Sequence, residues 1–257
     1  MVEFIIVFMP LFTFFLCIFQ MGLLYTASLG VQRAAHKAAR AAAVVFPDDP
    51  KKYENSMPNQ ISTYGCEDDE SSKLTAILGA LSDGDMEEKS NCKGGPRVSA
   101  IRTAAILSML PFSSRLDRII PAFSFGSSTV VGLASSFAYS MTLTAVNFPV
   151  ERGSQTLKQP GDFIDSDKDV TVRVTHAFHC QIPVAKNIIC SSWRDRMINR
   201  IQFNSDDPSN EILALNELDA GVSMPRLADL ALVSRERFFL LRKDASFPMQ
   251  GAGYDYQ

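Results

Sequence analysis

Residues 2–45 read VEFIIVFMPLFTFFLCIFQMGLLYTASLGVQRAAHKAARAAAVV, and this stretch decides the fold. Alanine and arginine, which fill its second half, are strong helix formers. No helix breaker follows until Phe46-Pro47-Asp48-Asp49-Pro50. The stretch therefore predicts one continuous helix from about Glu3 to Val45, within a first unit that we place at residues 1–46.

The first half of this helix has the composition of a membrane span. From Phe4 to Leu29 the chain is almost wholly apolar, and about 20 apolar residues in a helix cross a bilayer core. A cleaved signal peptide would have a basic start and a shorter apolar core. Here the start is Met1-Val2-Glu3, without Lys or Arg, so we expect the segment to stay in the membrane.

A stripe of small residues runs along one side of the predicted helix. Small side chains let helix backbones approach closely, so the stripe is a candidate surface for packing against neighbouring subunits. High helix propensity in an ordinary surface helix explains the same pattern equally well. The stripe consists of Ala27, Gly30, Ala34, Ala38 and Ala42.

Two further residues of the span have individual roles. Glu3 is a carboxylate immediately before the apolar run. It suits the positive end of the helix dipole, and it is also a candidate to pair with a cation of a neighbouring chain. Pro10 lies inside the helix, where it removes one backbone hydrogen bond, a change that membrane helices tolerate.

The five cysteines divide into one apolar and four polar positions. Cys17 lies in the apolar run and is expected to pack as a small hydrophobic residue. The other four allow three pairings, of which we favour Cys66–Cys92 and Cys180–Cys190 because neighbouring pairs close the shortest loops. Disulfides persist in oxidising compartments. Four free cytosolic thiols are the alternative.

The rest of the chain predicts a linker at residues 47–60 and an α+β domain at 61–257, with short helices and a small antiparallel sheet. Alternation of apolar and polar residues predicts strands, whereas apolar spacing of three to four predicts helices. Thr129–Phe148 is apolar and fits either. The predicted strands are Val170–Phe178 and Arg237–Phe247, and the predicted helices are Lys73–Leu81, Val98–Leu110 (with Ile101, Ala104, Ala105 and Leu107 or Ser108 on its apolar side), Ser209–Asp219 and Pro225–Val233.

Several classes of function find no support in the sequence. The net charge of −3 argues against nucleic-acid binding, which needs a basic surface. The sequence has no G-x-S-x-G, H-E-x-x-H or phosphate-binding glycine loop, so we expect no enzyme and no cofactor. His176 and His179 fall on opposite faces of a predicted strand and cannot share a metal ion without a bulge in that strand. Asp165–Asp169 resembles the start of a calcium-binding loop, but Val170 stands where that loop requires glycine.

The N-terminal residues resemble a known family. The acid–aromatic pair Glu3-Phe4, with Pro10 seven residues after the acid, is similar to the start of TadE-like proteins, the minor pseudopilins of tight-adherence (type IVc) pilus systems. Val170–Thr175 and the tail at Ala245–Ala252 are also similar to that family. The resemblance covers the N-terminal helix well and the rest in patches.

The resemblance implies a membrane-anchored subunit that acts in pilus assembly through helix packing. Its partners would be other pilin or pseudopilin subunits, the pilus assembly machinery and the inner membrane, with no nucleic acid. The contact residues would be Glu3, Phe4, Pro10 and the small-residue stripe. The alternative function is a single-span, envelope-anchored binding or sensor protein unrelated to a filament.

The topology of the span has two opposing indications. Lys and Arg usually mark the cytoplasmic side, and Arg33, Lys37 and Arg40 follow the span, which would place the body inside. The cysteines and the family resemblance indicate the opposite, since the basic leader of such pseudopilins would supply positive charge before the span. We expect a single-pass inner-membrane protein with its N-terminus cytoplasmic and its body periplasmic, and a possible place in an extracellular pilus.

Overall fold

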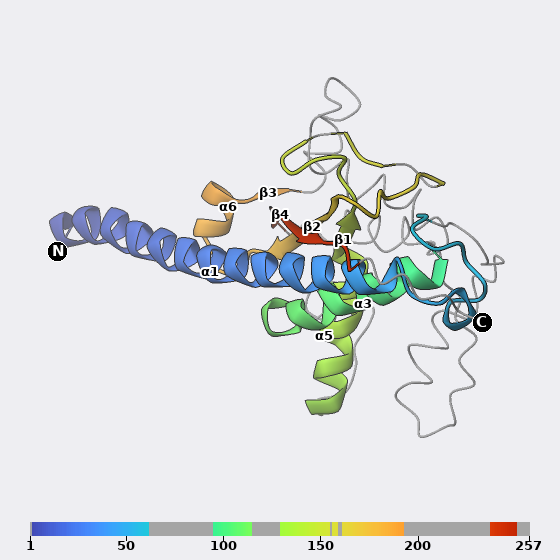
Figure 1. The fold of residues 1–257 in the computed structure, drawn as a ribbon. Coiled ribbons are helices and arrows are strands. Elements are labelled where there is room, and N and C mark those ends of the chain that lie inside the picture. Colours follow the sequence, from blue (N-terminus) through green and yellow to red (C-terminus); the bar gives the residue numbers. More distant parts are fainter. Residues whose placement is uncertain are drawn as a thin grey trace.

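A computed structural model describes residues 2–61, 95–114, 129–192 except 155, 159 and 160, and 237–250. In these residues a long helix extends far beyond a body of helices and strands (Figure 1). The architecture is α+β, as predicted, with an antiparallel sheet and short helices following the long helix. The predicted Cys66–Cys92 bridge and the predicted helices at 73–81, 209–219 and 225–233 lie outside the described residues.

The first helix, α1, confirms the prediction of one continuous element. It runs without interruption from Val2 to Val45 and contains Pro10. The other described helices are shorter: the single-turn 3-10 helices η1 (Pro50–Lys52) and η2 (Leu110–Phe112), and the α-helices α3 (Gly95–Met109), α5 (Thr129–Leu143) and α6 (Ala185–Ile189).

The sheet has four antiparallel strands in the order β1-β2-β4-β3. Its centre is the long pair β2 and β4, in which Asp169 faces Pro248 at one end and His179 faces Phe238 at the other. The predicted strands at 170–178 and 237–247 are therefore confirmed almost residue for residue. The strands are β1 (Thr144–Asn147), β2 (Asp169–His179), β3 (Ser191–Ser192) and β4 (Arg237–Pro248).

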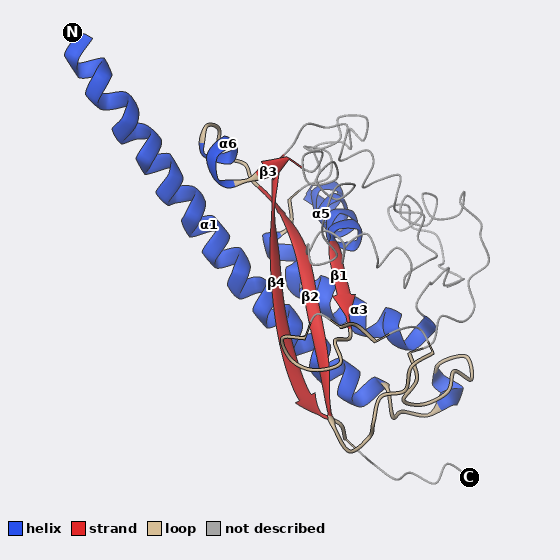
Figure 2. Cartoon of the chain, turned by 90° about the horizontal axis from the view of Figure 1, so that it is seen from above, coloured by secondary structure: helices blue, strands red, loops and turns tan. Residues whose placement is uncertain are grey.

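Helix α1 is divided into an exposed half and a buried half. From Phe4 to Phe19 the described side chains are exposed or half-buried, whereas one side of the helix is buried from Gln20 onward. The buried stripe continues to Val45, about 39 Å of helix at 1.5 Å per residue. The body is therefore built on the C-terminal half, and the N-terminal half protrudes from it (Figure 2).

The buried half of α1 is the centre of the hydrophobic core. Its alanines pack with the valines of β2, namely Val170, Val172 and Val174, on one face of the sheet. Helix α3 contacts the same half of α1 and contributes Ile101, Ala105 and Met109 to the core. Arg33, Lys37 and Arg40 lie on the exposed side of the helix, so the alternation of alanine with basic residues is that of a helix half-buried in its own domain.

The two segments that the sequence left open are resolved by the structure. Thr129–Phe148 forms both predicted alternatives in turn, a 15-residue helix and then the short edge strand β1. On the predicted helix 98–110, Ser108 is buried and Leu107 is exposed. The hydroxyl of Ser108 donates to the carbonyl of Ala104. The backbone of the same helix therefore satisfies this hydroxyl group, and the serine can be buried.

The segment at 47–60 is fastened to the body by backbone hydrogen bonds. The N–H of Asn59 donates to the carbonyl of Phe46 at 2.8 Å, and its own carbonyl accepts from the N–H of Ile164 at 2.7 Å. Gln60 forms an isolated bridge with Phe163. The chain that leaves α1 thus returns beside the end of that helix.

At Gly30 the ring of Phe112 approaches α1 closely. A Cβ atom at this position would lie 2.4 Å from a ring carbon of Phe112 in η2, closer than real side-chain contacts allow. A Cβ atom at Gly22, which is exposed, would meet nothing within 4 Å. The two glycines of the helix therefore differ in function: Gly30 makes room for the ring, and Gly22 does not have a comparable neighbour.

We expect Gly30→Val to destabilise the body, because the ring of Phe112 must leave its place against the helix. Overpacking of this kind costs about 1–3 kcal/mol. The matched variant Gly22→Val is expected to change the free energy of unfolding little. Denaturant unfolding of the detergent-solubilised chain measures both, and equal midpoints for the two variants would contradict the close packing at Gly30.

Candidate subunit and membrane interface

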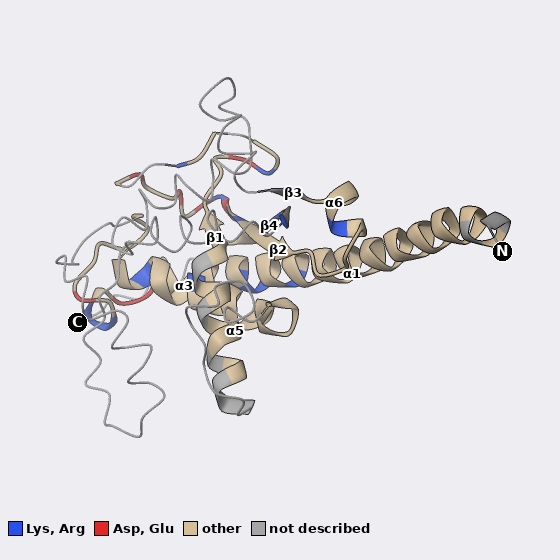
Figure 3. Ribbon diagram, turned by 180° about the vertical axis from the view of Figure 1, so that it is seen from behind, with Lys and Arg blue, Asp and Glu red and all other residues tan. Residues whose placement is uncertain are grey.

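The protruding half of α1 exposes many large apolar side chains. No Asp, Glu, Lys or Arg occurs from residue 4 to residue 32, and Figure 3 shows this part of the helix without charged residues. The helix is long and apolar enough to cross a membrane, and it is the one such helix among the described residues. Phe4 is 69% exposed.

Aromatic side chains follow the protruding half in rows. Phe4 and Phe8 stack with ring centroids 5.4 Å apart, and Phe8 and Phe12 stack at 5.7 Å. Phe15 and Phe19 form a third pair at 6.0 Å. Residues four apart lie on the same side of a helix, so these rings make continuous apolar ridges that a lipid or another helix can contact.

The structure separates the predicted contact residues into two groups. Glu3, Phe4 and Pro10 lie in the protruding half, outside the body. Ala27, Ala34, Ala38 and Ala42 have no exposed surface, and Gly30 is also buried. The chain's own sheet and α3 cover this stripe, so a sibling helix could reach it only if the body moved off α1.

The C-terminal end of α1 is closed by an arginine from a distant part of the sequence. Arg97, in the first turns of α3, is 1% exposed. The last carbonyl groups of a helix lack partners within the helix and carry the negative end of its dipole. The guanidinium supplies both a positive charge and several donors there. Its partners are the carbonyl oxygens of Val45, Phe46 (3.1 Å), Asp48 (2.9 Å) and Ser56 (3.2 Å), the Ser56 hydroxyl (2.9 Å), and the ring of Tyr53, whose centroid is 4.6 Å away.

A second buried arginine joins the two central strands. Arg173 of β2 faces Asp244 of β4 directly and donates to its two carboxylate oxygens at 2.7 and 2.8 Å. The same arginine donates to the carbonyl of Ser154, and the N–H of Gly153 donates to Asp244. Burial raises the pKa of Asp244, but the hydrogen bonds from Arg173 and Gly153 outweigh it, so the pKa lies below its usual value.

One of the two predicted disulfides is present in the described residues. Cys180 and Cys190 are bonded and close the loop that contains α6. Cys17 is the one free cysteine among the described residues. This loop lies at the end of the body nearest the protruding half of α1 (Figure 1), where Gln20 accepts a hydrogen bond from the N–H of Ile182 at 3.3 Å.

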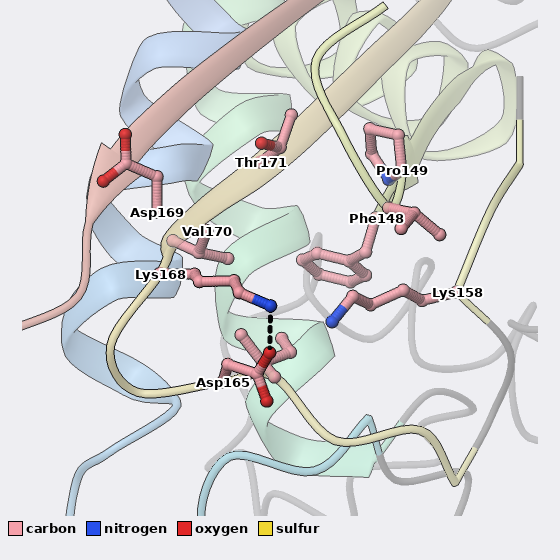
Figure 4. Close-up of a pocket in the computed structure, with 10 residues that line it drawn as sticks. Phe148, Pro149, Lys158, Asp165, Lys168, Asp169, Val170 and Thr171 are labelled. Carbon is pink, nitrogen blue, oxygen red and sulfur yellow. Dashed lines mark hydrogen bonds and ion pairs between the residues drawn. The ribbon is translucent and has the colours of Figure 1, made fainter. Parts of the chain in front are cut away.

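A hollow beside the start of β2 is lined by two lysines and two aspartates, together with apolar residues. Lys168 and Asp165 form an ion pair across it at 2.8 Å (Figure 4), and both side chains are largely exposed. Lys158 donates to the carbonyl of Phe163 at 2.9 Å. Exposed pairs of this kind contribute little to stability. The two amino groups are thus engaged by neighbouring oxygens.

The histidines predicted on β2 are separate, as expected from strand alternation. His176 is fully buried, 2.7 Å from the hydroxyl of Thr144 through Nδ1, and burial lowers its pKa to about 3. His179 contacts the ring of Phe238. The described residues contain no group of three or more His, Cys, Asp or Glu side chains that could hold a metal ion.

These features define a class of protein: a helix of membrane length whose C-terminal half is the core of an α+β body. Comparison with known families shows that residues 1–40 of the 257 match the family model described as TadE-like protein. The resemblance seen in Glu3-Phe4 and Pro10 is thereby confirmed. The match indicates a pilin-like protein associated with Tad pilus systems, a structural kind of protein. No curated protein and no solved structure matches the chain.

We expect Arg97→Met to lower the free energy of unfolding by about 3 kcal/mol, since it leaves the carbonyl groups at the end of α1 buried without donors. The methionine keeps much of the side-chain length, so the decrease in the free energy of unfolding comes mainly from the lost hydrogen bonds and charge. Denaturant unfolding measures this decrease. The matched variant Arg33→Met removes an exposed arginine of α1 and is expected to unfold with the wild-type midpoint; equal effects of the two variants would contradict the capping role.

We also expect the free energy of unfolding to decrease as the pH is lowered, because of His176. Its pKa is about 3 in the folded chain and near 6.5 when unfolded, so below about pH 6.5 the unfolded state binds a proton that the folded state rejects. The free energy of unfolding then falls by up to about 1.4 kcal/mol per pH unit between these values. Asp244, whose folded pKa is lowered, adds a further loss as the pH falls below about 4.

His176→Gln is expected to flatten the dependence between pH 6.5 and 4, measured as the change in unfolding midpoint with pH. The control His36→Gln removes an imidazole on the exposed side of α1 and leaves the contribution of His176 in place. An unchanged slope in the His176 variant would show that the buried imidazole does not cause the loss.

Proposed function

We propose that this chain is a membrane-anchored, minor pilin-like (TadE-like) subunit that acts in the assembly of a tight-adherence pilus through helix packing. One observation carries the proposal: a helix of membrane length protrudes from the body that its other half supports. The match to the TadE-like family covers the whole protruding half and continues to residue 40. Its partners in this proposal are other pilin or pseudopilin subunits and the assembly machinery.

The subunit contact in this proposal lies on the protruding half. The stripe from Ala27 to Ala42 is already covered by the body, and its role is to hold that body on the helix. Glu3, Phe4 and the aromatic ridges remain for neighbouring chains. A carboxylate in apolar surroundings is costly without a partner, so pairing of Glu3 with a cation of the next subunit would fix the register between them.

The orientation in this proposal places the body outside the cytoplasm. The bond between Cys180 and Cys190 supports this, because structural disulfides persist in oxidising compartments. Arg33, Lys37 and Arg40 lie on the exposed side of the helix within the body, and thus serve as its polar surface. A periplasm-active reporter fused after Gln257 would test the orientation, and activity from a cytoplasm-specific reporter would refute it.

We expect Glu3→Ala to leave the protein in the membrane but to stop its incorporation into the pilus, because the pairing that sets the register is lost. Membrane fractionation reports insertion, and the amount of the subunit and of pilus fibre in sheared surface fractions reports assembly. The matched variant Glu151→Ala removes an exposed glutamate of the body and is expected to assemble normally. Normal assembly by the Glu3 variant would remove the proposed pairing.

A further inference from the structure

The body meets the protruding half of α1 at Gln20. This side chain has no exposed surface, although it lies within the apolar run. Its Oε1 accepts from the N–H of Ile182 in the disulfide loop, residues 180–190, and α6 of that loop contacts α1. Figure 2 shows α6 as the part of the body at the level where the helix emerges. The disulfide loop is therefore fixed beside the root of the protruding half.

The disulfide loop presents apolar side chains to the solvent at this place. Val184 is 47% exposed and Ile188 is 64% exposed. Pro183, which precedes Val184 in the loop, is also exposed. A soluble surface seldom places such residues together without a partner. Lys186, within the same loop, has a long stem that can lie along an apolar surface while its amino group stays in a polar layer.

The backbone of the disulfide loop has an uncommon conformation at Val184, whose side chain is exposed. This residue has φ 69° and ψ −60°, and the N–H of Ala185 donates to the carbonyl of Pro183 at 2.8 Å. These are the features of a classic γ-turn, which is rare and strained, and positive φ is unusual for a β-branched residue. Such conformations persist where the surrounding structure imposes them, and they concentrate at functional surfaces.

Two sets of bonds impose this conformation. The disulfide joins the ends of the loop at Cys180 and Cys190. Arg237, at the start of β4, donates to the carbonyls of Asn187 and Cys190 at 3.2 and 3.1 Å. The loop is thus attached both to the sheet and, through Gln20, to the helix, and its exposed residues keep a fixed position relative to α1.

The length of the protruding half places the membrane surface at this loop. Residues 2–19 span about 27 Å as a helix, close to the roughly 30 Å of a bilayer hydrocarbon core. If the protruding half is the membrane span, which is part of the function proposed above, the boundary between hydrocarbon and headgroups falls near Gln20. The disulfide loop lies at that depth, beside the span.

We propose that the disulfide loop is a second membrane contact, which rests on the body-side leaflet with Val184 and Ile188 inserted among the headgroups. The occupant of this apolar surface is lipid, because the surface is continuous with the membrane helix and lies at the depth where that helix enters the bilayer. Burial of apolar side chains at the interface provides the attraction. Two contacts, the helix and the loop, then fix the orientation of the body on the membrane.

Fluorescence quenching by brominated lipids tests this contact in the full chain, reconstituted at low density in phosphatidylethanolamine and phosphatidylglycerol vesicles. The background is Trp193→Phe, which removes the single native tryptophan. Ile188→Trp places an indole on the disulfide loop, and Phe12→Trp places one in the middle of the protruding half. The control Phe163→Trp replaces an exposed aromatic residue of the body beside the segment that follows the far end of α1.

With bromine near the headgroup end of the acyl chains, we expect the Ile188→Trp chain to lose emission and shift to shorter wavelength, and the Phe163→Trp chain to do neither. Adding Cys180→Ser and Cys190→Ser should reduce the quenching of the Ile188→Trp chain by freeing the loop. Quenching of the Phe12→Trp chain without quenching of the Ile188→Trp chain overturns the loop contact and leaves the anchor in place. Absence of quenching in both overturns the anchor as well.

Discussion

The packing of the alanine side of α1 against the sheet and α3 is the constraint on which the rest of the structure depends. Because these side chains are small, the valines of β2 and the residues of α3 approach the helix axis closely. The close approach of Phe112 to Gly30 is one example. A helix with larger side chains on this side would hold the sheet and α3 further away, and the core would lose its density.

This arrangement gives the two halves of one helix different environments. The half after Gln20 is a core element of the body, and the half before it has apolar side chains that are exposed or half-buried. No loop separates the two halves, since α1 is continuous from Val2 to Val45. The position of the body along the helix therefore sets its height above whatever surrounds the protruding half.

The elements of the fold could be predicted where their signal is local. The long helix follows from composition and the absence of breakers, and β2 and β4 follow from alternation along each strand. The pairing of Cys180 with Cys190 was also accessible, because only a short loop separates them. In contrast, the sequence could not place α5 and β1 separately, since an apolar segment without clear periodicity fits both a helix and a strand.

The decisive polar contacts were not predictable, because each joins residues far apart in the sequence. Arg97 closes a helix that ends about fifty residues earlier, and no pattern around it distinguishes it from an exposed arginine. Gln20 is a polar residue in an apolar run, and its bond to Ile182 crosses 162 positions. The small-residue stripe was visible, but its spacing does not tell whether the chain's own body or a neighbouring chain covers it.

The order of the elements along the chain has a consequence for biosynthesis. Helix α1 leaves the ribosome well before β4, the strand at Arg237–Pro248 that covers part of its alanine side. All residues from the end of α1 to Pro248 must be synthesised before the core can close. During that interval the alanine side of the nascent helix is uncovered, and a polypeptide truncated before β4 would retain a hydrophobic helix side that quality-control proteases can recognise.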